Sequence, residues 1–132
     1  MKSSENKVIS KDFAHPDERR NFKGHGHLDV LNFEDGTMIG LGVFEPGWRW
    51  SNDVKPIVET ESCEADHTGY CVKGRMTIRM NSGEEFQIKA GEAFRIPPGH
   101  DAWVEGNETC EALDVTGYRD YAVKKGSQKK VA

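Results

Sequence analysis

The sequence contains few cysteines, and no secretory signal is visible in it. Cys63, Cys71 and Cys110 make an odd number of thiols. The opening segment MKSSENKVISKDF has no apolar stretch of the kind found in secretory leaders. A disulfide framework is therefore not expected, and we predict reduced thiols and a cytoplasmic location.

Long apolar runs and an excess of positive charge are also missing. No run approaches the roughly 20 apolar residues of a membrane-spanning helix, so we expect no membrane partner. The formal net charge of −4 and the pI of about 5.7 argue against a nucleic-acid partner. The basic segment KKGSQKK, residues 124–130, is typical of a solvated chain end. Glycine-rich phosphate loops and nucleophile-elbow serines are absent as well.

The length of 132 residues fits one domain. Residues 1–24 are polar and charged, and we expect them to form an N-terminal arm. Residues 25–118 carry the β-rich pattern of the folded domain, and residues 119–132 form a polar, basic tail. No segment of ten or more residues shows an apolar stripe at helical spacing.

Short apolar runs separated by turn residues predict an all-β domain. Two such runs, residues 28–33 and 37–44, flank the turn sequence EDG and predict a hairpin. In RMTIRM, residues 75–80, Met76, Ile78 and Met80 alternate with polar side chains, which is the pattern of a half-buried strand. The spacing of roughly 8 to 12 residues between runs indicates a β-sandwich or barrel.

Two glycine-centred motifs resemble those of the cupin superfamily. Gly91 is followed by five residues and then by Pro97-Pro98-Gly99, and six residues separate His67 from Gly74. The resemblance extends over residues 40–116. It implies a single-domain jelly-roll (cupin) β-barrel that encloses a metal site and a small-molecule site, and such barrels commonly pair as homodimers.

The resemblance places the family's metal ligands at positions that hold other residue types here. Its first motif puts them at Glu61, Cys63 and His67, and its last histidine falls at Ala102. Glu, Cys and His are all competent metal ligands. His100 lies two residues before Ala102 and projects to the same side of a regular strand. The predicted metal ligands are therefore Glu61, Cys63, His67 and His100.

The ligand types favour particular metals. A thiolate with imidazoles favours zinc or copper. If Cys63 turns away, two histidines with Glu61 resemble a facial triad that suits iron or manganese. Two alternatives remain open. In one, His67 and His100 bind a ligand in a metal-free pocket. In the other, all these residues are structural.

Bulky aromatic side chains and a second thiol are candidates for ligand binding. Trp48, Trp50 and Trp103 are either core residues or the mouth of a pocket for an aromatic or apolar molecule. Strand parity puts Cys71 on the face of His67. The segment HGH, residues 25–27, has the spacing of a histidine pair on one strand face, although an exposed strand start is the favoured interpretation.

These residues support two hypotheses about function. The first is a metal-dependent small-molecule protein, including an enzyme, whose metal keeps one position open. The second is a binding or sensing module without turnover, either metal-free or with a closed structural metal. Glu61 discriminates between them, because as a fourth ligand it would close the site. A third, weaker hypothesis is a role in oligomerisation through sheet edges.

Overall fold

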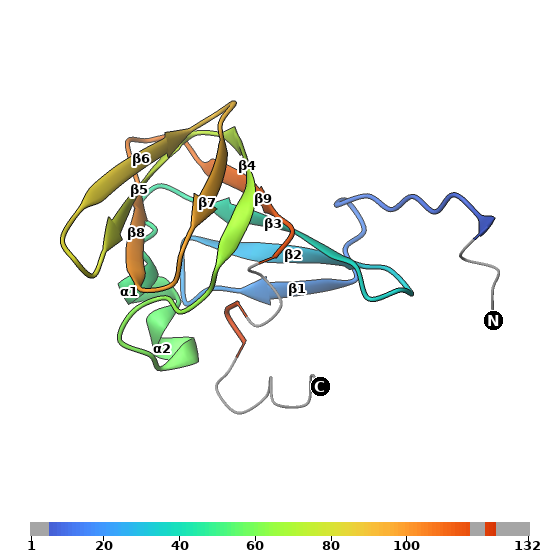
Figure 1. Cartoon of the computed structure of the whole chain (residues 1–132), viewed down its shortest axis with the longest axis horizontal. Helices are drawn as coiled ribbons and strands as arrows, with labels where there is room; N and C mark the ends of the chain where they lie inside the picture. The colour runs from blue at the N-terminus through green and yellow to red at the C-terminus, as the bar shows by residue number, and fades with distance from the viewer. Residues whose placement is uncertain (1–5, 117–120, 124–132) are drawn as a thin grey trace.

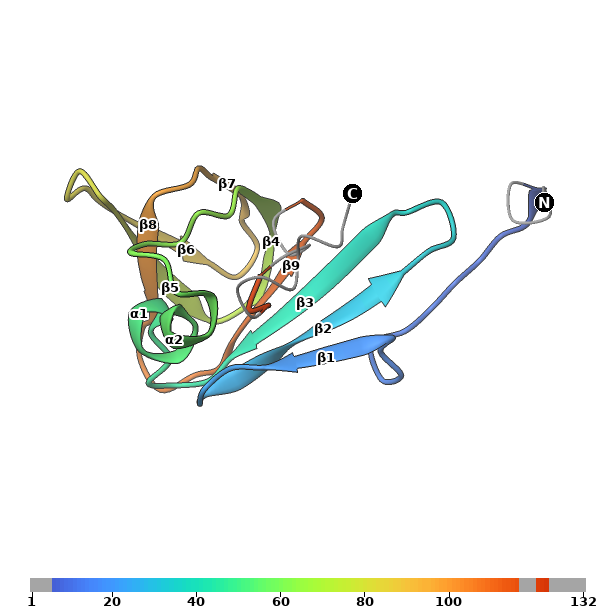
Figure 2. The same ribbon diagram turned by 90° about the horizontal axis from the view of Figure 1, so that it is seen from below.

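The computed structural model describes residues 6–116 and 121–123, which form two facing antiparallel β-sheets (Figures 1 and 2). The larger sheet has the order β1-β2-β3-β9-β4-β7 and the smaller one the order β6-β5-β8. The strands are β1 (Glu18–Asn21), β2 (Gly26–Asn32), β3 (Met38–Phe44), β4 (His67–Lys73), β5 (Arg75–Met80), β6 (Glu85–Lys89), β7 (Ala93–Ile96), β8 (His100–Val104) and β9 (Cys110–Asp114).

The strand order is that of a jelly roll. β9 returns between β3 and β4, so the last strand of the chain pairs with one early and one middle strand. Within the described ranges, hydrogen bonds do not join the two sheets, and the fold is a jelly-roll β-sandwich rather than a fully closed barrel. The predicted all-β jelly-roll class is confirmed.

Two one-turn helices close one end of the sandwich. Helix α1 (Trp50–Asp53) lies against β8 and is followed directly by α2 (Lys55–Val58). Figure 2 shows both helices beside the β5–β8 end of the smaller sheet. Neither helix in the described part of the chain has the length and apolar character needed to span a membrane.

The predicted hairpin and half-buried strand are both confirmed. β2 and β3 pair in register from Gly26 opposite Phe44 to Asn32 opposite Met38. In β5, Met76 and Ile78 are buried as the alternation predicts. Thr77 on the other face is buried too, because Trp103 of β8 lies directly opposite it.

The larger sheet begins inside the segment that we predicted to be a polar arm. β1 pairs with β2, and Arg19 donates two hydrogen bonds to the buried carboxylate of Asp29, at 2.7 and 3.0 Å. Phe22 follows β1 and stacks on Phe44, with ring centroids 5.5 Å apart. The sequence ERRN gave no apolar alternation because β1 is an edge strand with largely exposed side chains. Of the predicted tail, residues 121–123 are described and Tyr121 is buried, while residues 124–130 lie outside the described residues.

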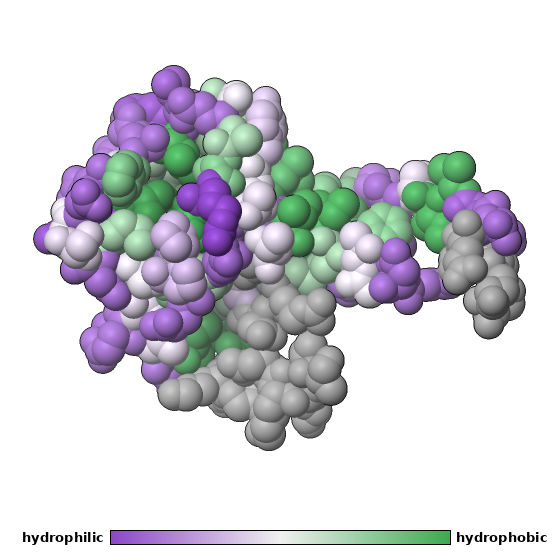
Figure 3. All heavy atoms as spheres, in the orientation of Figure 1, coloured by the Kyte–Doolittle hydropathy of each residue, from purple (hydrophilic) through white to green (hydrophobic). Residues whose placement is uncertain are grey.

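The core lies between the two sheets and is aromatic at one end. Trp48 packs edge-on against Phe44, with ring centroids 4.5 Å apart, and also touches Phe22. Figure 3 shows hydrophilic residues over much of the visible face of the sandwich. Apolar residues are visible where the β2–β3 hairpin extends beyond it.

Candidate metal centre

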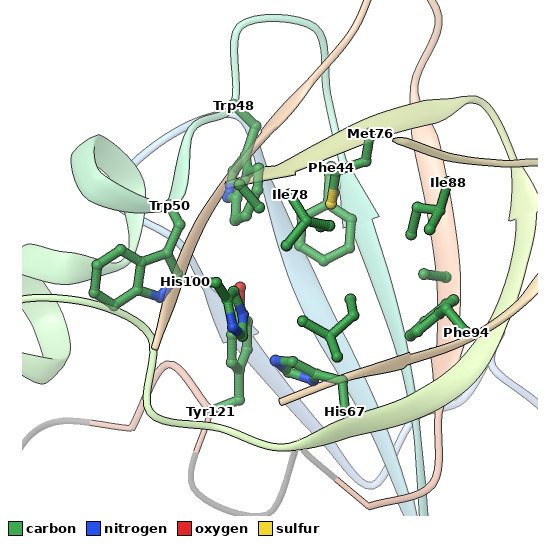
Figure 4. A pocket seen from close by; sticks show the side chains of 13 residues that line it. Phe44, Trp48, Trp50, His67, Met76, Ile78, Ile88, Phe94, His100 and Tyr121 are labelled. Atoms are coloured by element: carbon green, nitrogen blue, oxygen red, sulfur yellow. The ribbon is translucent and has the colours of Figure 1, made fainter. Parts of the chain in front are cut away.

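Cys63, His67 and His100 converge at the wall of the core, and each offers one ligand atom within 4.8 Å of the others. The Cys63 Sγ atom lies 3.7 Å from His67 Nε2. In a tetrahedral zinc site, with Zn–S of about 2.3 Å and Zn–N of about 2.0 Å, sulfur and nitrogen ligands are about 3.5 Å apart. The observed spacing therefore fits two ligands of one metal ion. Figure 4 shows the His67 and His100 rings close together at one side of the pocket.

Backbone hydrogen bonds hold Cys63 beside His100. The Cys63 N–H donates to the His100 carbonyl at 2.7 Å, and the Gly99 N–H donates to the Cys63 carbonyl at 2.7 Å. His100 is the first residue of β8, where His100, Ala102 and Val104 are buried and the residues between them are partly exposed. His100 and Ala102 thus lie on the same buried face of β8, as predicted. His67 enters from the larger sheet as the first residue of β4, opposite Ile96.

A hydrogen bond at Nδ1 fixes the tautomer of each histidine. His67 Nδ1 is bonded to the buried carboxylate of Asp114, and His100 Nδ1 lies 2.8 Å from the Pro97 carbonyl oxygen. Both partners accept hydrogen bonds, so in the neutral ring each Nδ1 carries the proton and each Nε2 keeps its lone pair. Metal-bound histidines in proteins almost always have such an outer partner. Both rings are therefore already in the tautomer that binds metal through Nε2.

Burial disfavours the charged forms of His100 and Cys63 in the absence of a metal. Burial, and secondarily the neighbouring His67, lowers the pKa of His100 to about 4, so its ring is neutral at pH 7. Burial raises the pKa of the Cys63 thiol to about 12, opposed by a hydrogen bond from the Ala65 backbone, while nearby carboxylates including Asp114 raise it further. A metal ion that binds here must displace the thiol proton, so binding releases a proton.

Glu61 lies outside this cluster, which corrects its prediction as the fourth ligand. Its side chain is 99% exposed, and its carboxylate lies 3.5 Å from the Lys55 ammonium group. Strand parity does not apply at Glu61, because the segment between α2 and β4 is irregular and begins at Glu59 in a left-handed conformation, with φ of 63°. The cluster therefore offers three candidate protein ligands.

Two of the three predicted tryptophans reach the interior. Trp48 and Trp50 are 2% exposed and line the pocket beside the histidines (Figure 4). Trp103 does not line it, because alternation along β8 turns it outward. There its ring stacks on the Arg49 guanidinium group at 4.2 Å, and its Nε1 donates to Glu105 at 3.1 Å.

Cys71 is buried on the inward face as predicted, but it does not line the pocket. Its sulfur lies 4.0 Å from the Cys110 sulfur, between β4 and β9. Gly69 sits between His67 and Cys71 because the backbones approach closely there. A Cβ atom at Gly69 would lie 1.8 Å from the Leu113 carbonyl oxygen.

The pocket beside the metal cluster is small and apolar, with a volume of about 30 Å³. Its aromatic wall is formed by Phe44, Trp48, Trp50, Phe94 and Tyr121. Aliphatic side chains and the two cluster histidines complete the lining. None of the described lining residues is Lys, Arg, Asp or Glu.

One polar atom in this wall has no protein partner. The Trp48 indole nitrogen Nε1 is buried and forms no hydrogen bond with any residue that the structure describes. An indole N–H can only donate, and leaving a buried donor unsatisfied costs about 1–3 kcal/mol.

Sequence reasoning missed Asp114 and Tyr121. A signal for Asp114 was present, because CEALD alternates in β9 so that Cys110, Ala112 and Asp114 all face inward. An acidic residue at an inward strand position requires a buried partner. Tyr121 gave no signal, because it follows the last predicted strand.

The paired histidines His25 and His27 form no joint site. His25 Nδ1 lies 3.1 Å from an oxygen of the buried Asp53 carboxylate, and His27 Nε2 lies 3.5 Å from an oxygen of Asp29. Each ring thus has its own carboxylate partner. Neither ring belongs to the metal cluster.

A family model described as a cupin domain matches residues 58–116, which include all three cluster residues. No curated protein matches the sequence. A solved structure described as a cupin-like protein from Thermotoga maritima is 20% identical, with a TM-score of 0.51 over 74% of this chain and 71% of that protein.

Two further solved structures align over more of the chain. The polyketide cyclase RemF from Streptomyces resistomycificus is 18% identical, with a TM-score of 0.59 over 84% of this chain and 80% of RemF. A protein of unknown function from Rhizobium leguminosarum is 18% identical, with a TM-score of 0.58 over 84% of this chain and 98% of that protein. At such identities the likeness establishes the fold, and function must be argued from the site.

Proposed function

Because the chain belongs to the cupin superfamily, we propose that it binds one divalent transition metal ion through Cys63, His67 and His100 and presents it to a small molecule in the adjoining pocket. Zinc or copper is the first expectation, since thiolate and imidazole ligands suit these ions, and iron or manganese is the second. The observation that carries the proposal is the fixed tautomer of both histidines, each with Nδ1 bonded and Nε2 left for the metal.

The number of ligands favours a site that keeps a position for a small molecule. Catalytic zinc sites typically have three protein ligands and one exchangeable position, whereas structural sites have four protein ligands. The exposed position of Glu61 leaves three ligands in the cluster. A metal held here would supply Lewis-acid polarisation, or activation of water or dioxygen. His67 and His100 line the pocket, so a small molecule there would lie beside them.

The alternative is a binding or sensing module without turnover. Apart from the two histidines, Tyr121 is the one titratable side chain among the described lining residues. Since both histidines are engaged as ligands in the proposed metal site, the pocket offers few groups for general acid–base catalysis. Chemical change in a bound molecule during incubation with the metal-loaded protein would support an enzyme. Its recovery unchanged, as measured by mass spectrometry, would support the binding module.

The remaining sequence predictions are a cytoplasmic location, a homodimer, and no nucleic-acid or membrane partner. They are consistent with the proposal and stay predictions. Size-exclusion chromatography with light scattering would measure the oligomeric state directly.

The test of the proposed function is metal content by mass spectrometry on untagged protein purified without added metal. We expect near-stoichiometric metal in the wild type and its loss in Cys63→Ala, His67→Ala and His100→Ala. Glu61→Ala is the matched control and should keep its metal. A wild-type protein that stays free of metal after reconstitution with zinc, copper, iron and manganese would refute the metal site.

A further inference from the structure

The face of the larger sheet that is turned away from the core carries a group of apolar side chains. Phe44, Ala112 and Cys71 point inward from β3, β9 and β4. Alternation therefore turns outward the odd-numbered residues of β3 and β9 and the even-numbered residues of β4. The outer apolar face consists of six of these, Ile39, Leu41, Val43, Tyr70, Val72 and Leu113.

The pairing of the strands makes this face continuous. Leu41 lies opposite Leu113, and Leu113 lies opposite Tyr70, so one apolar row crosses three adjacent strands. Tyr70 is 46% exposed and Val72 is 45% exposed. In Figure 2 the smaller sheet and both helices lie on the other side of the larger sheet. Contiguous apolar surface of this kind marks an interaction site on a soluble protein.

The smaller sheet shows what a solvated face looks like in the same molecule. Its one outward aromatic side chain among the described residues, Trp103, lies under the Arg49 guanidinium group at 4.2 Å. Antiparallel sheets with one solvated face carry polar side chains there. The outward residues of β5 and β6 follow this rule, and they are Arg75, Thr77, Arg79, Glu85, Gln87 and Lys89. The larger sheet departs from it, which indicates that its outer face is covered by a partner.

We propose that the outer apolar face is the interface of a symmetric homodimer, in which a second copy of this chain presents the same face. Six strands about 4.8 Å apart, with about six residues each at about 3.4 Å, give roughly 600 Å² per copy. Two copies then bury about 1,200 Å², which is at the lower end of stable interfaces. Sheets pack readily face to face, and a two-fold pair covers both apolar surfaces with one contact. This inference does not depend on the proposed metal site.

The charges at the borders of the face are compatible with a second copy. On the β2 side Arg19 donates to Asp29 at 2.7 and 3.0 Å, and on the β7 side Arg95 pairs with Asp66. Each border therefore carries one cation and one anion that are already paired. Two such faces can approach without repulsion between unpaired like charges at these borders, although each chain has a net charge of −4.

The test is sedimentation equilibrium of the wild type and three lysine variants between about 1 and 100 μM, a range suited to an interface of this size. We expect the wild type to reach twice the 14.8 kDa mass of one chain. Tyr70→Lys and Val72→Lys should each raise the dimer dissociation constant at least about tenfold, because they bury a cation in the interface. Phe86→Lys is the matched control, since Phe86 is 56% exposed on β6 of the smaller sheet, and it should dimerise like the wild type.

A labelling experiment locates the interface without adding charge. The three native cysteines are buried, so a maleimide reports mainly on the exposed thiol introduced by Val72→Cys or Phe86→Cys. Above the measured dissociation constant, Val72→Cys should react at least about tenfold more slowly than below it, whereas Phe86→Cys should react equally at both concentrations. A wild type that keeps the mass of one chain throughout the range would overturn the second copy as the partner. Dimers that persist unchanged in both Tyr70→Lys and Val72→Lys, or equal labelling of Val72→Cys in dimer and monomer, would overturn this face as the interface.

Discussion

Replacing Asp114 by asparagine tests whether the hydrogen bond behind His67 prepares that ring for metal. One carboxylate oxygen of Asp114 is bonded to His67 Nδ1, and the other accepts the Thr116 N–H at 2.8 Å. The side chain is fully buried. Asp114→Asn keeps the shape but provides a single acceptor oxygen, so one of these two donors must face an amide NH₂ group instead.

The size of the effect follows from which donor loses its acceptor. Loss of an outer partner of a metal-bound histidine typically weakens metal affinity 10- to 100-fold, or about 1.4–2.8 kcal/mol. If the amide turns its NH₂ group toward Thr116, the metal-free protein instead loses about 1–3 kcal/mol of unfolding free energy. The carboxylate charge is lost in either orientation, so the metal affinity falls in both.

The assay is competition for zinc with a chromophoric chelator, together with urea unfolding of the metal-free protein. Asp53→Asn is the matched control, because Asp53 is buried, accepts the Arg49 N–H at 3.0 Å and pairs with His25, yet takes no part in the metal cluster. We expect Asp53→Asn to lose stability and keep wild-type zinc affinity. Zinc affinity in Asp114→Asn within twofold of the wild type would refute this role of the carboxylate.

Three further predictions concern pH, packing and the outer face of β8. Since the folded-state pKa of His100 is lowered from 6.5 to about 4, the unfolded chain binds more protons between these values. Stability of the metal-free protein is then fully present above pH 6.5, and we expect about 3 kcal/mol to be lost as pH falls to 4. Urea unfolding at both pH values should show this loss in the wild type and a smaller one in His100→Gln. Gly69→Ala should cost at least about 3 kcal/mol, because its Cβ would collide with the Leu113 carbonyl. Gly24→Ala is the control, because its Cβ would meet its nearest neighbour at 3.4 Å, and it should unfold close to the wild-type temperature. Equal melting temperatures for Gly69→Ala and Gly24→Ala would contradict the predicted cost at Gly69. Trp103→Phe should leave the metal content unchanged, because this ring lies outside the pocket, and a loss of metal would contradict that position.

Where residues follow a regular strand, the sequence predicted their positions well. Strand parity was sufficient to bring His100 to the inward face of β8, two residues before the position at which the family motif expects a histidine. The same alternation turns Trp103 outward, a consequence that was available from the sequence. The hairpin of β2 and β3 followed from its turn residues and its two apolar runs.

Where the chain leaves regular structure, side-chain positions could not be predicted from periodicity. Glu61 lies between a one-turn helix and a strand, so its direction depends on local backbone angles that no periodicity encodes. β1 is an edge strand, and its pairing depends on hydrogen bonds from backbone groups that any residue carries. Tyr121 reaches the pocket by tertiary packing, with its backbone carbonyl accepting a hydrogen bond from Arg20 at 2.8 Å. Long-range partners of this kind are fixed only by the folded chain.

The positions of His67 and His100 would also make a bound metal a cross-link. His67 belongs to β4 of the larger sheet and His100 to β8 of the smaller one, whereas within the described residues the sheets share no backbone ladder. A metal ion bound to both histidines would therefore clamp the sandwich at one point along its seam. Free metal at 100 times its dissociation constant would add about 2.7 kcal/mol to the free energy of unfolding. Metal supply would then regulate how readily the two halves of the sandwich part, and with it the resistance of the protein to proteolysis.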